Sequence, residues 1–310
     1  MIVVIGSINM DLVMRVSRMP RPGETLSGGQ FQTIPGGKGA NQAVACARLS
    51  RNGNVAMIAC LGDDAFGTEL RAALRRDGID DTHVSTIVGM SSGVAAIAVD
   101  ANGQNSIVLA AGANDALSPA HIDAASALIA QAQVVVLQLE TPLATVRHAI
   151  QLAHSLNKIV VLNPAPAQAL PLELLRQLTY LIPNEIEAAM LAKLPVASLD
   201  SDAEIDAVIA ELRTCGCGNV LVTLGAKGVR AALSGGIRHF AAQPTTAIDT
   251  TAAGDTFIGG FVAALADGQT EAEAIDFGQR AAALSVTRVG AQTSIPYRRE
   301  LLSASTSTRP

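Results

Sequence analysis

Short apolar runs alternate with amphipathic runs over nearly the whole chain. The apolar runs are hydrophobic on both pleat faces, which is typical of parallel strands covered by helices on both sides. They comprise residues 2–6, 55–62, 134–140, 159–165, 180–184 and 219–225. Helical periodicity follows in residues 40–50, 66–78, 142–158 and 202–216, with glycine closing several of these segments. The alternation predicts an α/β fold with a doubly wound, mostly parallel sheet flanked by helices.

Two segments break this rhythm. Residues 12–34 carry Pro and Gly turn signals between short alternating runs, and residues 88–110 are typical of a hairpin that turns at Asn102–Gly103. Each segment is too short to fold alone, so we expect them to form a small antiparallel β appendage on the main domain. Because neither a repeat nor a linker divides the chain, we expect one domain over residues 1–310.

Composition narrows the class of protein. Of 310 residues, 49% are hydrophobic and 16% charged, which is enough apolar material for a large core. A net charge of −5 and the absence of Trp argue against a nucleic-acid partner. The start, MIVVIGSINMD, lacks the basic region of a signal peptide, and no apolar run reaches the roughly 18 residues of a membrane span. We therefore expect a cytoplasmic protein without membrane contact.

An acidic residue at the start of a helical run is the strongest candidate for chemistry. Asp255 lies in DTTAAGDTFIGGF, behind the small residues Ala252, Ala253 and Gly254. The carboxylate could simply cap the helix, but the amides of 252–254 could equally form an anion hole. A carboxylate is a weak base for a hydroxyl, yet phosphoryl transfer moves the proton late, so a carboxylate that orients the hydroxyl suffices. Capping and catalysis are compatible here.

Polar residues also stand where predicted strands end. Asn9 and Asp11 in GSINMD share one side of the chain and could hold vicinal hydroxyls, although a solvated loop explains them as well. Glu140 ends the run LQLE. The Gly-rich PGGKGANQ (35–42) is either a structural turn or a ligand loop. It lacks the Walker A spacing, and no GxGxxG follows the first strand, so a P-loop NTPase and a nicotinamide oxidoreductase are both disfavoured.

Two further motifs have a structural and a functional interpretation each. Asn184 and Glu187 in PNEIEA could organise water around Mg²⁺, or Glu187 could only favour the helix dipole. The stretch VTLGAKG could wrap nucleotide phosphates with its amides, or form a plain β-turn. The five histidines show no metal-binding spacing.

Taken together and in this order, the motifs are more specific than any one of them. The chain resembles the ribokinase/phosphofructokinase-B family of carbohydrate kinases over residues 2–297. The resemblance rests on GSINMD, GGKGANQAVA, LQLE, NPAPA, PNEIEA, VTLGAKG, DTTAAGDTF and VTRVGAQTSIP. It implies ATP-dependent phosphorylation of a sugar, with GSINMD, LQLE and the C-terminal motif favouring the 5-hydroxyl of D-ribose. A kinase for 2-deoxyribose, another furanose or a nucleoside is the alternative within the family.

The resemblance also implies roles for individual residues. Asp255 would be the catalytic base, with Ala252, Ala253 and Gly254 as the anion hole. The sugar would be held by Asn9, Asp11, Gly37, Lys38, Asn41, Glu140 and Asp255. ATP would contact Asn184, Thr223, Leu224, Gly225, Ala226, Lys227, Gly228, Gly254 and Gln279, with Mg²⁺ held through water by Asn184 and Glu187. An activating K⁺ would be bound by Asp249, Thr251, Ser285, Arg288, Gly290 and Ser294.

The same resemblance makes the β appendage a lid over the sugar and the interface of a homodimer. Two positions depart from the family's pattern. Gln279 stands where such kinases often have His, and Met10 lies inside the sugar motif. A non-catalytic sugar sensor with the same fold is a rival from another functional class, although the intact Asp255 motif argues against it.

Overall fold

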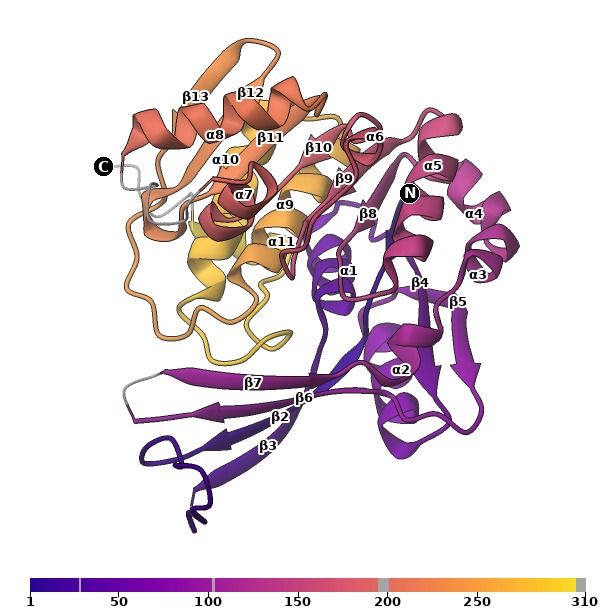
Figure 1. Ribbon diagram of the computed structural model, residues 1–310, viewed down its shortest axis with the longest axis vertical. Helices are drawn as coiled ribbons and strands as arrows, with labels where there is room; N and C mark the ends of the chain where they lie inside the picture. Colours follow the sequence, from indigo (N-terminus) through magenta and orange to yellow (C-terminus); the bar gives the residue numbers. More distant parts are fainter. Residues whose placement is uncertain (28, 102–103, 195–200, 305–310) are drawn as a thin grey trace.

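The computed structural model describes residues 1–27, 29–101, 104–194 and 201–304. The main sheet is built from β1 (Ile2–Ile5), β4 (Val55–Gly62), β5 (Asp80–Ile87), β8 (Val134–Leu137), β9 (Ile159–Leu162), β10 (Tyr180–Leu181), β11 (Asn219–Thr223), β12 (Val229–Leu233) and β13 (Gly236–Phe240). Their order across the sheet is β13-β12-β11-β10-β9-β8-β1-β4-β5 (Figure 1). All six predicted strands are present, although five of them end earlier than the apolar runs do.

The winding of this sheet creates one topological switch point. Neighbouring strands from β5 across to β11 are parallel, while β12 and β13 extend the edge in antiparallel fashion. The chain winds one way from β1 to β5 and the other way from β8 to β11. The carboxyl ends of β1 and β8 therefore flank the place where open α/β sheets bind ligands.

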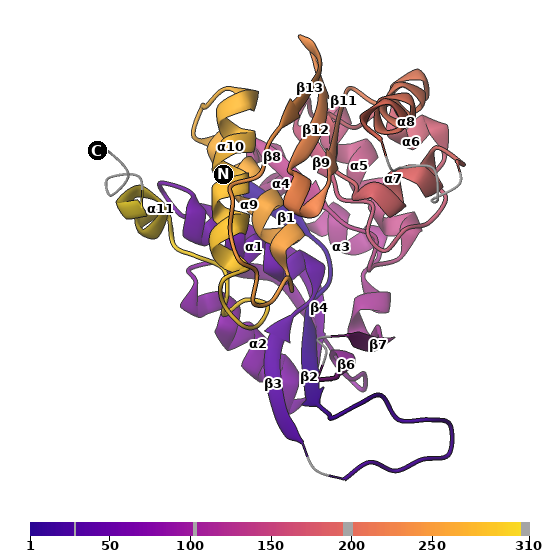
Figure 2. The ribbon, with the colours of Figure 1, turned by 90° about the vertical axis from the view of Figure 1, so that its left-hand side faces the viewer.

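Helices cover both faces of the sheet (Figure 2). One face carries α1 (Lys38–Leu49), α2 (Ala65–Arg76), α9 (Ala253–Ala266), α10 (Glu271–Ser285) and α11 (Arg298–Ala304). The other carries α3 (Pro119–Ala124), α4 (Ser126–Gln131), α5 (Leu143–Ser155), α6 (Leu172–Leu175), α7 (Glu185–Leu191) and α8 (Asp202–Thr214). Successive side chains of β1 enter the two hydrophobic cores in turn. Val4 lies in the core under α1, α2, α9 and α10, and Val3 lies in the core under α3 to α8. The predicted doubly wound α/β fold is confirmed.

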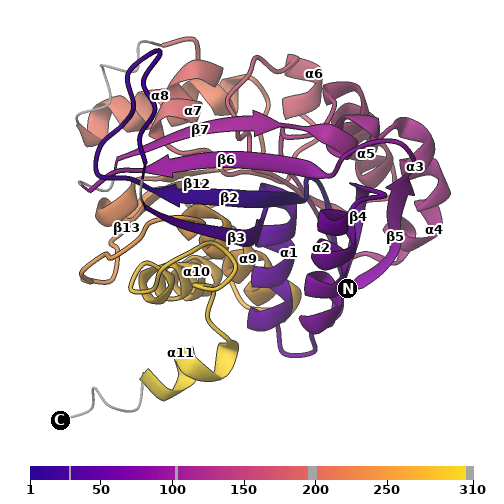
Figure 3. The ribbon, with the colours of Figure 1, turned by 90° about the horizontal axis from the view of Figure 1, so that it is seen from below.

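A smaller sheet projects from the main body (Figures 1 and 3). Its strands are β2 (Asn9–Arg15), β3 (Gln30–Gly36), β6 (Gly93–Val99) and β7 (Asn105–Ala110), in the order β3-β2-β6-β7. The hairpins β2–β3 and β6–β7 are antiparallel as expected, but they join through a parallel β2–β6 pair. The sheet also begins at Asn9 rather than at residue 12, so the motif GSINMD belongs to it. The turn expected at 102–103 lies outside the described residues.

No helix within the described ranges is long and apolar enough to cross a membrane.

Candidate active site

The Gly-rich segment forms the turn that starts α1. Gly37 has a φ of 90°, a conformation that favours glycine. A Cβ on Gly39 would come within 2.6 Å of the backbone nitrogen of Ser7, two residues after β1. The amide of Ala40 donates to the carbonyl of Ser7 at 2.9 Å. The glycines thus allow α1 to approach β1 closely, which places Lys38 at the switch point.

The N-terminus of α9 faces the same place. Ala252 is its N-cap residue and has a φ of 56°, which for a residue with a Cβ costs about 1–3 kcal/mol. The amide of Ala253 donates to the carbonyl of Thr250 at 3.2 Å. Among the described residues, the amides of Gly254 and Asp255 have no hydrogen-bond acceptor. Within the expected anion-hole segment 252–254, the amide of Gly254 is therefore available to a ligand while that of Ala253 is engaged. The amide of Asp255, just outside that segment, is available as well.

Asp255 is held by α1 rather than by its own helix. Its Oδ2 accepts from Asn41 Nδ2 at 3.1 Å and its Oδ1 from Gln42 Nε2 at 2.9 Å. The residue is only 8% exposed. Burial raises the pKa of Asp255, whereas Lys38 and the two donors lower it, and the net pKa lies above that of an exposed carboxyl. Both hydrogen bonds to the carboxylate therefore come from α1, and within the described residues none comes from the backbone of α9.

The sugar-motif residues on β2 lie beside this carboxylate. The Oδ1 of Asn9 accepts from Asn114 Nδ2 at 2.8 Å, and both residues are buried. Burial, reinforced by the charges of Glu140 and Asp255, raises the pKa of Asp11 to about 7. That electrostatic coupling requires the three carboxyls to be close together. The fold thus brings Asp11 of β2, Glu140 from the segment after β8 and Asp255 of α9 close together.

Lys38 supplies the positive charge of this cluster. Its backbone amide donates to Glu140 Oε2 at 3.1 Å, and Ser7 Oγ donates to the same oxygen at 2.6 Å. Burial lowers the pKa of Lys38, but nearby carboxylates outweigh it and the net pKa rises. This one cation stands among four carboxyl groups: Asp11, Glu140, Glu187 and Asp255. Carboxyl groups therefore outnumber Lys38 at this site, and a bound cation would favour their ionised forms.

Two adjoining cavities open beside Asp255. The first, of about 250 Å³, is lined by Lys38, Asn184, Glu187 and Asp255 among others. The second, of about 450 Å³, is lined mainly by small and apolar side chains together with Gln279. The two cavities share Thr223, Thr250, Ala253 and Gly254. A ligand with a charged and an apolar end could therefore lie across both.

Not every residue expected at the nucleotide reaches these cavities. Gly225, Ala226 and Gly228 line the apolar cavity, in and after the short 3₁₀ turn Gly225–Lys227. Leu224 is instead buried in the core, and the carbonyl of Lys227 pairs with His239 Nε2 at 2.8 Å. Sequence reasoning missed several further residues that line the apolar cavity: Val229, Ala242, Gln243, Pro244, Thr245, Ala247, Phe257, Ala282, Ala283 and Val286.

Asn184 and Glu187 form a capping box at the start of α7. Asn184 Oδ1 accepts from the amide of Glu187 at 2.8 Å, and the carboxylate of Glu187 accepts from the amide and the side chain of Asn184. Burial raises the pKa of Glu187 despite that backbone bond and the charge of Lys38. Glu187 lies in the first turn of α7, as the structural interpretation expects, but the capping box was not predicted. Both residues also line the charged cavity.

The segment expected to bind K⁺ is drawn together by one carboxylate. Asp249 Oδ1 accepts from the amide of Thr251 at 2.9 Å and from its hydroxyl at 2.6 Å. Asp249 Oδ2 accepts from the amide of Gly290 at 2.9 Å. Burial opposes ionisation of Asp249, but these donors outweigh it and lower the pKa. The carboxylate thus ties the loop before Ala252 to the segment that follows α10.

The other residues expected at K⁺ use their side chains for contacts of different kinds. The guanidinium of Arg288 pairs with Glu300 Oε1 at 2.6 Å, and its amide donates to the carbonyl of Ser285. Ser285 and Ser294 are both fully buried, and their hydroxyls donate to backbone carbonyls. Arg288 therefore uses its side chain for the contact with α11. In the described part of the chain, no cluster of three or more His, Cys, Asp or Glu residues could hold a metal ion directly.

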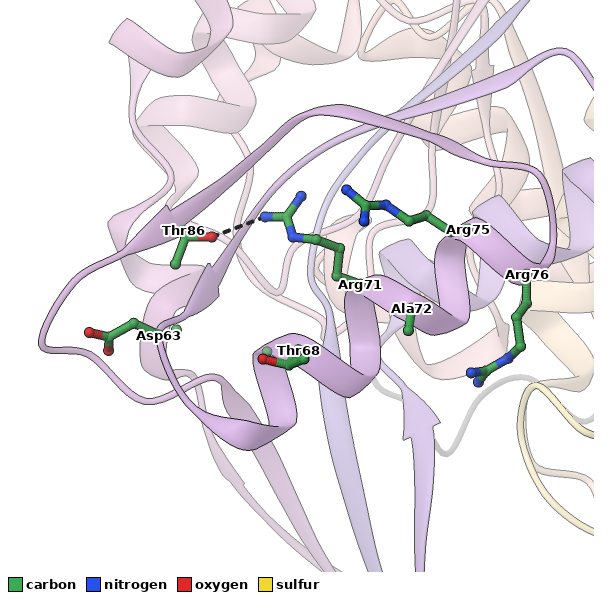
Figure 4. A pocket seen from close by; sticks show the side chains of 9 residues that line it. Asp63, Thr68, Arg71, Ala72, Arg75, Arg76 and Thr86 are labelled. Carbon is green, nitrogen blue, oxygen red and sulfur yellow. Dashed lines mark hydrogen bonds between the residues drawn. The ribbon is translucent and has the colours of Figure 1, made fainter.

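A separate pocket of about 540 Å³ lies along α2 and β5 (Figure 4). Arg71 points toward Thr86 and donates to its hydroxyl at 3.1 Å. Arg71 and Arg75 also both pair with Asp81. Two arginines of this pocket thus share one carboxylate, whereas around Asp255 the carboxyl groups outnumber Lys38.

Several buried polar residues at the site were missed. Gln42 directly follows the predicted Asn41, and Asn163 lies in the motif NPAPA, so both could have been found from their neighbours. Gln138 lies two residues before Glu140 in the motif LQLE and could have been found in the same way, whereas Asn114 lies in none of the quoted motifs. Their importance comes from contacts with segments about a hundred residues away.

Fold and site together define a class of protein. A buried carboxylate and free helix amides, set between a cluster that can bind hydroxyls and a two-part cavity, are the arrangement expected of a phosphotransferase acting on a small polyol. The chain belongs to the pfkB family of carbohydrate kinases, whose pattern it matches over residues 1–298.

Individual relatives are similar over almost their full length. The ribokinase of Haemophilus influenzae is 48% identical over 299 residues, covering 96% of both chains. A deoxyribokinase of Salmonella typhi is 40% identical over 296 residues, covering 95% of both. Among solved structures, the ribokinase of Arabidopsis thaliana complexed with ribose and ATP superimposes with a TM-score of 0.90 at 32% identity, covering 97% of both chains.

Proposed function

We propose that this protein is an ATP-dependent kinase that phosphorylates the 5-hydroxyl of D-ribose. The observation that carries the proposal is the position of Asp255, between free amides of α9 and the polar cluster on β2. The choice of ribose is supported by the relatives named ribokinase, one at 48% identity, and by the likeness to a ribokinase complexed with ribose and ATP.

The sugar would lie among Asn9, Asp11, Asn41, Glu140 and the Gly37–Lys38 turn. Asn41 supports this placement because its Oδ1 is buried and has no partner among the described residues. An unpaired buried acceptor costs about 1–3 kcal/mol, and a sugar hydroxyl would recover that cost. The several carboxyl groups are equally suited to accept hydrogen bonds from vicinal hydroxyls.

Asp255 would accept the proton of the primary hydroxyl. Its raised pKa makes it a better base than an exposed aspartate, while Lys38 and its two amide donors keep the charged form accessible. The amides of Gly254 and Asp255 would stabilise charge on the phosphoryl group in transfer, with Ala252 and Ala253 fixing the geometry of the loop. Because the transition state is loose, orientation and charge stabilisation carry most of the catalysis.

ATP would lie across the two cavities, with its base in the apolar one beside Gln279 and its phosphates in the charged one. Asn184 and Glu187 would hold Mg²⁺ through water, and the surplus of carboxyl groups over Lys38 fits a divalent cation. When bound, Mg²⁺ neutralises phosphate charge. Leu224 would support the turn from the core, and Lys227 would contribute only its backbone.

K⁺ would be held by Asp249, Thr251, Ser285, Arg288, Gly290 and Ser294, several of them through carbonyls. The pKa of Asp249 is lowered, and the carboxylate accepts hydrogen bonds from its own loop and from the segment after α10. Both features fit a monovalent cation there. Because this loop ends at Ala252, the cation would act electrostatically by fixing the segment that presents the free amides.

The four-stranded sheet would act as a lid within one domain of residues 1–310, since β2 supplies two sugar-site residues. Its exposed apolar side chains, including Phe31 at 61% and Val108 at 70%, support a homodimer formed through the lid. The supply of ATP would place the enzyme in the cytoplasm.

The test is ADP formation with D-ribose, 2-deoxyribose and other furanoses, using wild type, Asp255→Asn and the surface control Asp276→Asn. We expect ribose to give the highest kcat/KM and Asp255→Asn to lose about 10²–10⁴-fold in kcat with sugar binding intact. A loss below about tenfold would reject Asp255 as base. Preference for 2-deoxyribose would favour the function of the Salmonella typhi relative, and no ADP with any sugar would favour a sensor.

A further inference from the structure

Three buried side-chain amides form a chain that ends at Asp255. Gln42 Nε2 donates to Asp255 Oδ1 at 2.9 Å and to Asn163 Oδ1 at 3.2 Å. Gln138 Nε2 donates to Gln42 Oε1 at 2.6 Å. Asn163 Nδ2 donates to the backbone carbonyl of Ile182 at 3.0 Å. Gln42 is 0% exposed and Gln138 1%, so both are shielded from solvent, while Asn163, at 7%, also lines the charged cavity.

The direction of every bond in this chain is fixed by the backbone. The carbonyl of Ile182 can only accept, so Asn163 must turn its NH₂ group toward it. Asn163 then presents its oxygen to Gln42, which must answer with its NH₂ group. One hydrogen of that group goes to Asn163 and the other is left for Asp255. The oxygen of Gln42 faces Gln138, which supplies the matching donor.

This polarity bears directly on the protonation state of Asp255. With its NH₂ toward the carboxyl, Gln42 stabilises the ionised form, which is the form a base needs. A reversed amide would set oxygen against oxygen and would demand a protonated, inactive Asp255. We propose that Gln42 is a positioning residue, oriented by Asn163 and Gln138, that holds Asp255 ionised and aimed at the substrate hydroxyl. The proposal rests on the proposed kinase function and adds a determinant of its pH dependence.

The other charged groups near Asp255 act in both directions. Lys38, on α1, lowers the pKa of Asp255, as do the amides of Gln42 and Asn41, whereas burial and Glu140 raise it. Asp11 on β2 and Glu187 on α7 are coupled to the same carboxyl. With burial opposing ionisation, loss of the Gln42 donor removes one of the few contributions that favour the charged form.

The experiment compares wild type with Gln42→Met, Gln42→Glu and Gln138→Met, and uses Gln177→Met as a control. Gln177 is a part-buried glutamine that lines a different pocket. We expect Gln42→Met to move the acidic limb of the kcat–pH profile up by about one unit or more, a tenfold loss at low pH that recovers as pH rises. Gln42→Glu should move it further because two carboxyls must share a proton. Gln138→Met should move it less, and Gln177→Met not at all.

A second measurement does not depend on activity. The ¹³C resonance of the Asp255 carboxyl, assigned by its loss in Asp255→Asn, gives the pKa in the substrate-free protein. An elevated pKa in Gln42→Met supports the inference even if the kinase assignment fails. An unchanged pKa in both Gln42 variants, or a kcat loss equal at every pH, overturns it. If Gln42→Met does not fold, Gln138→Met decides the question by the same resonance.

Discussion

Gly259 sets the distance between the two helices that build the site. It lies one turn after Asp255 on α9, and Ala45 lies one turn after Asn41 on the neighbouring α1 (Figure 1). A Cβ at position 259 would stand 2.2 Å from the Cβ of Ala45 and 2.9 Å from the amide nitrogen of Cys46. Ordinary carbon contacts need about 3.5–4.0 Å, so Gly259→Ala must push the helices apart by roughly 1.5 Å.

That displacement is large compared with the tolerance of the site. The bonds from Asn41 and Gln42 to Asp255 measure 3.1 and 2.9 Å and would lengthen beyond hydrogen-bonding distance. We expect kcat to fall by about 100-fold, as for a misplacement of about 1 Å, and the free energy of unfolding to drop by about 1–3 kcal/mol through overpacking.

The assays are steady-state ADP formation and urea unfolding. Gly235→Ala is the control, because no atom lies within 4 Å of a Cβ at that glycine. The double variant Ala45→Gly/Gly259→Ala removes the closest clash and should recover part of both losses. The argument that this contact positions Asp255 would be refuted by a Gly259→Ala protein that stays close to wild type in both assays. Its kcat would lie within about twofold of wild type and its free energy of unfolding within about 0.5 kcal/mol.

Four further outcomes are expected. The carboxyl of Asp11 has a pKa of about 7 in the folded protein against 3.8 when exposed, so the folded state binds more protons between these values and stability falls as pH rises through them. Asp11→Asn should therefore raise Tm at neutral pH while abolishing sugar binding; an unchanged Tm would contradict the shift. Asn114→Ala removes three bonds, two to the backbone of Ile8 and one to Asn9, and should cost about 3 kcal/mol in urea unfolding and raise the KM for sugar. Replacing K⁺ with Na⁺ should lower kcat without changing Tm by more than a few degrees, and indifference to the swap would remove the cation site. Chelation with EDTA should abolish ADP formation and Mg²⁺ should restore it; activity that survives EDTA would exclude a divalent requirement.

The local sequence determined the elements and several of the reactive groups. Strands that are apolar on both pleat faces require a sheet covered by helices on both sides. Glycines after the helical runs mark where the helices end. The placing of Asp255 behind two alanines and a glycine already indicated a helix start with free amides. Such features depend only on neighbours in the chain, so they can be recognised from a short window of sequence.

The predicted ends and pairing of the strands were less accurate, because they depend on residues that are distant in the chain. The apolar run 134–140 is a strand only as far as Leu137, because pairing with β1 and β9 ends there. The pairing of β2 with β6 is parallel although each belongs to an antiparallel hairpin. Pairing partners come from distant segments, and a local pattern does not specify them.

Only the tertiary structure shows that the carboxyl of Asp255 turns to α1 rather than to its own helix. A cap and a base look alike in sequence, and they differ by whether the carboxyl turns to its own helix or to another one. The partner Asn41 is 214 residues away, and the amide chain through Gln42 and Gln138 joins three segments of the fold. The sequence specifies that α1 and α9 each have an apolar face, but the direction of a buried hydrogen bond depends on the group opposite, which packing alone supplies.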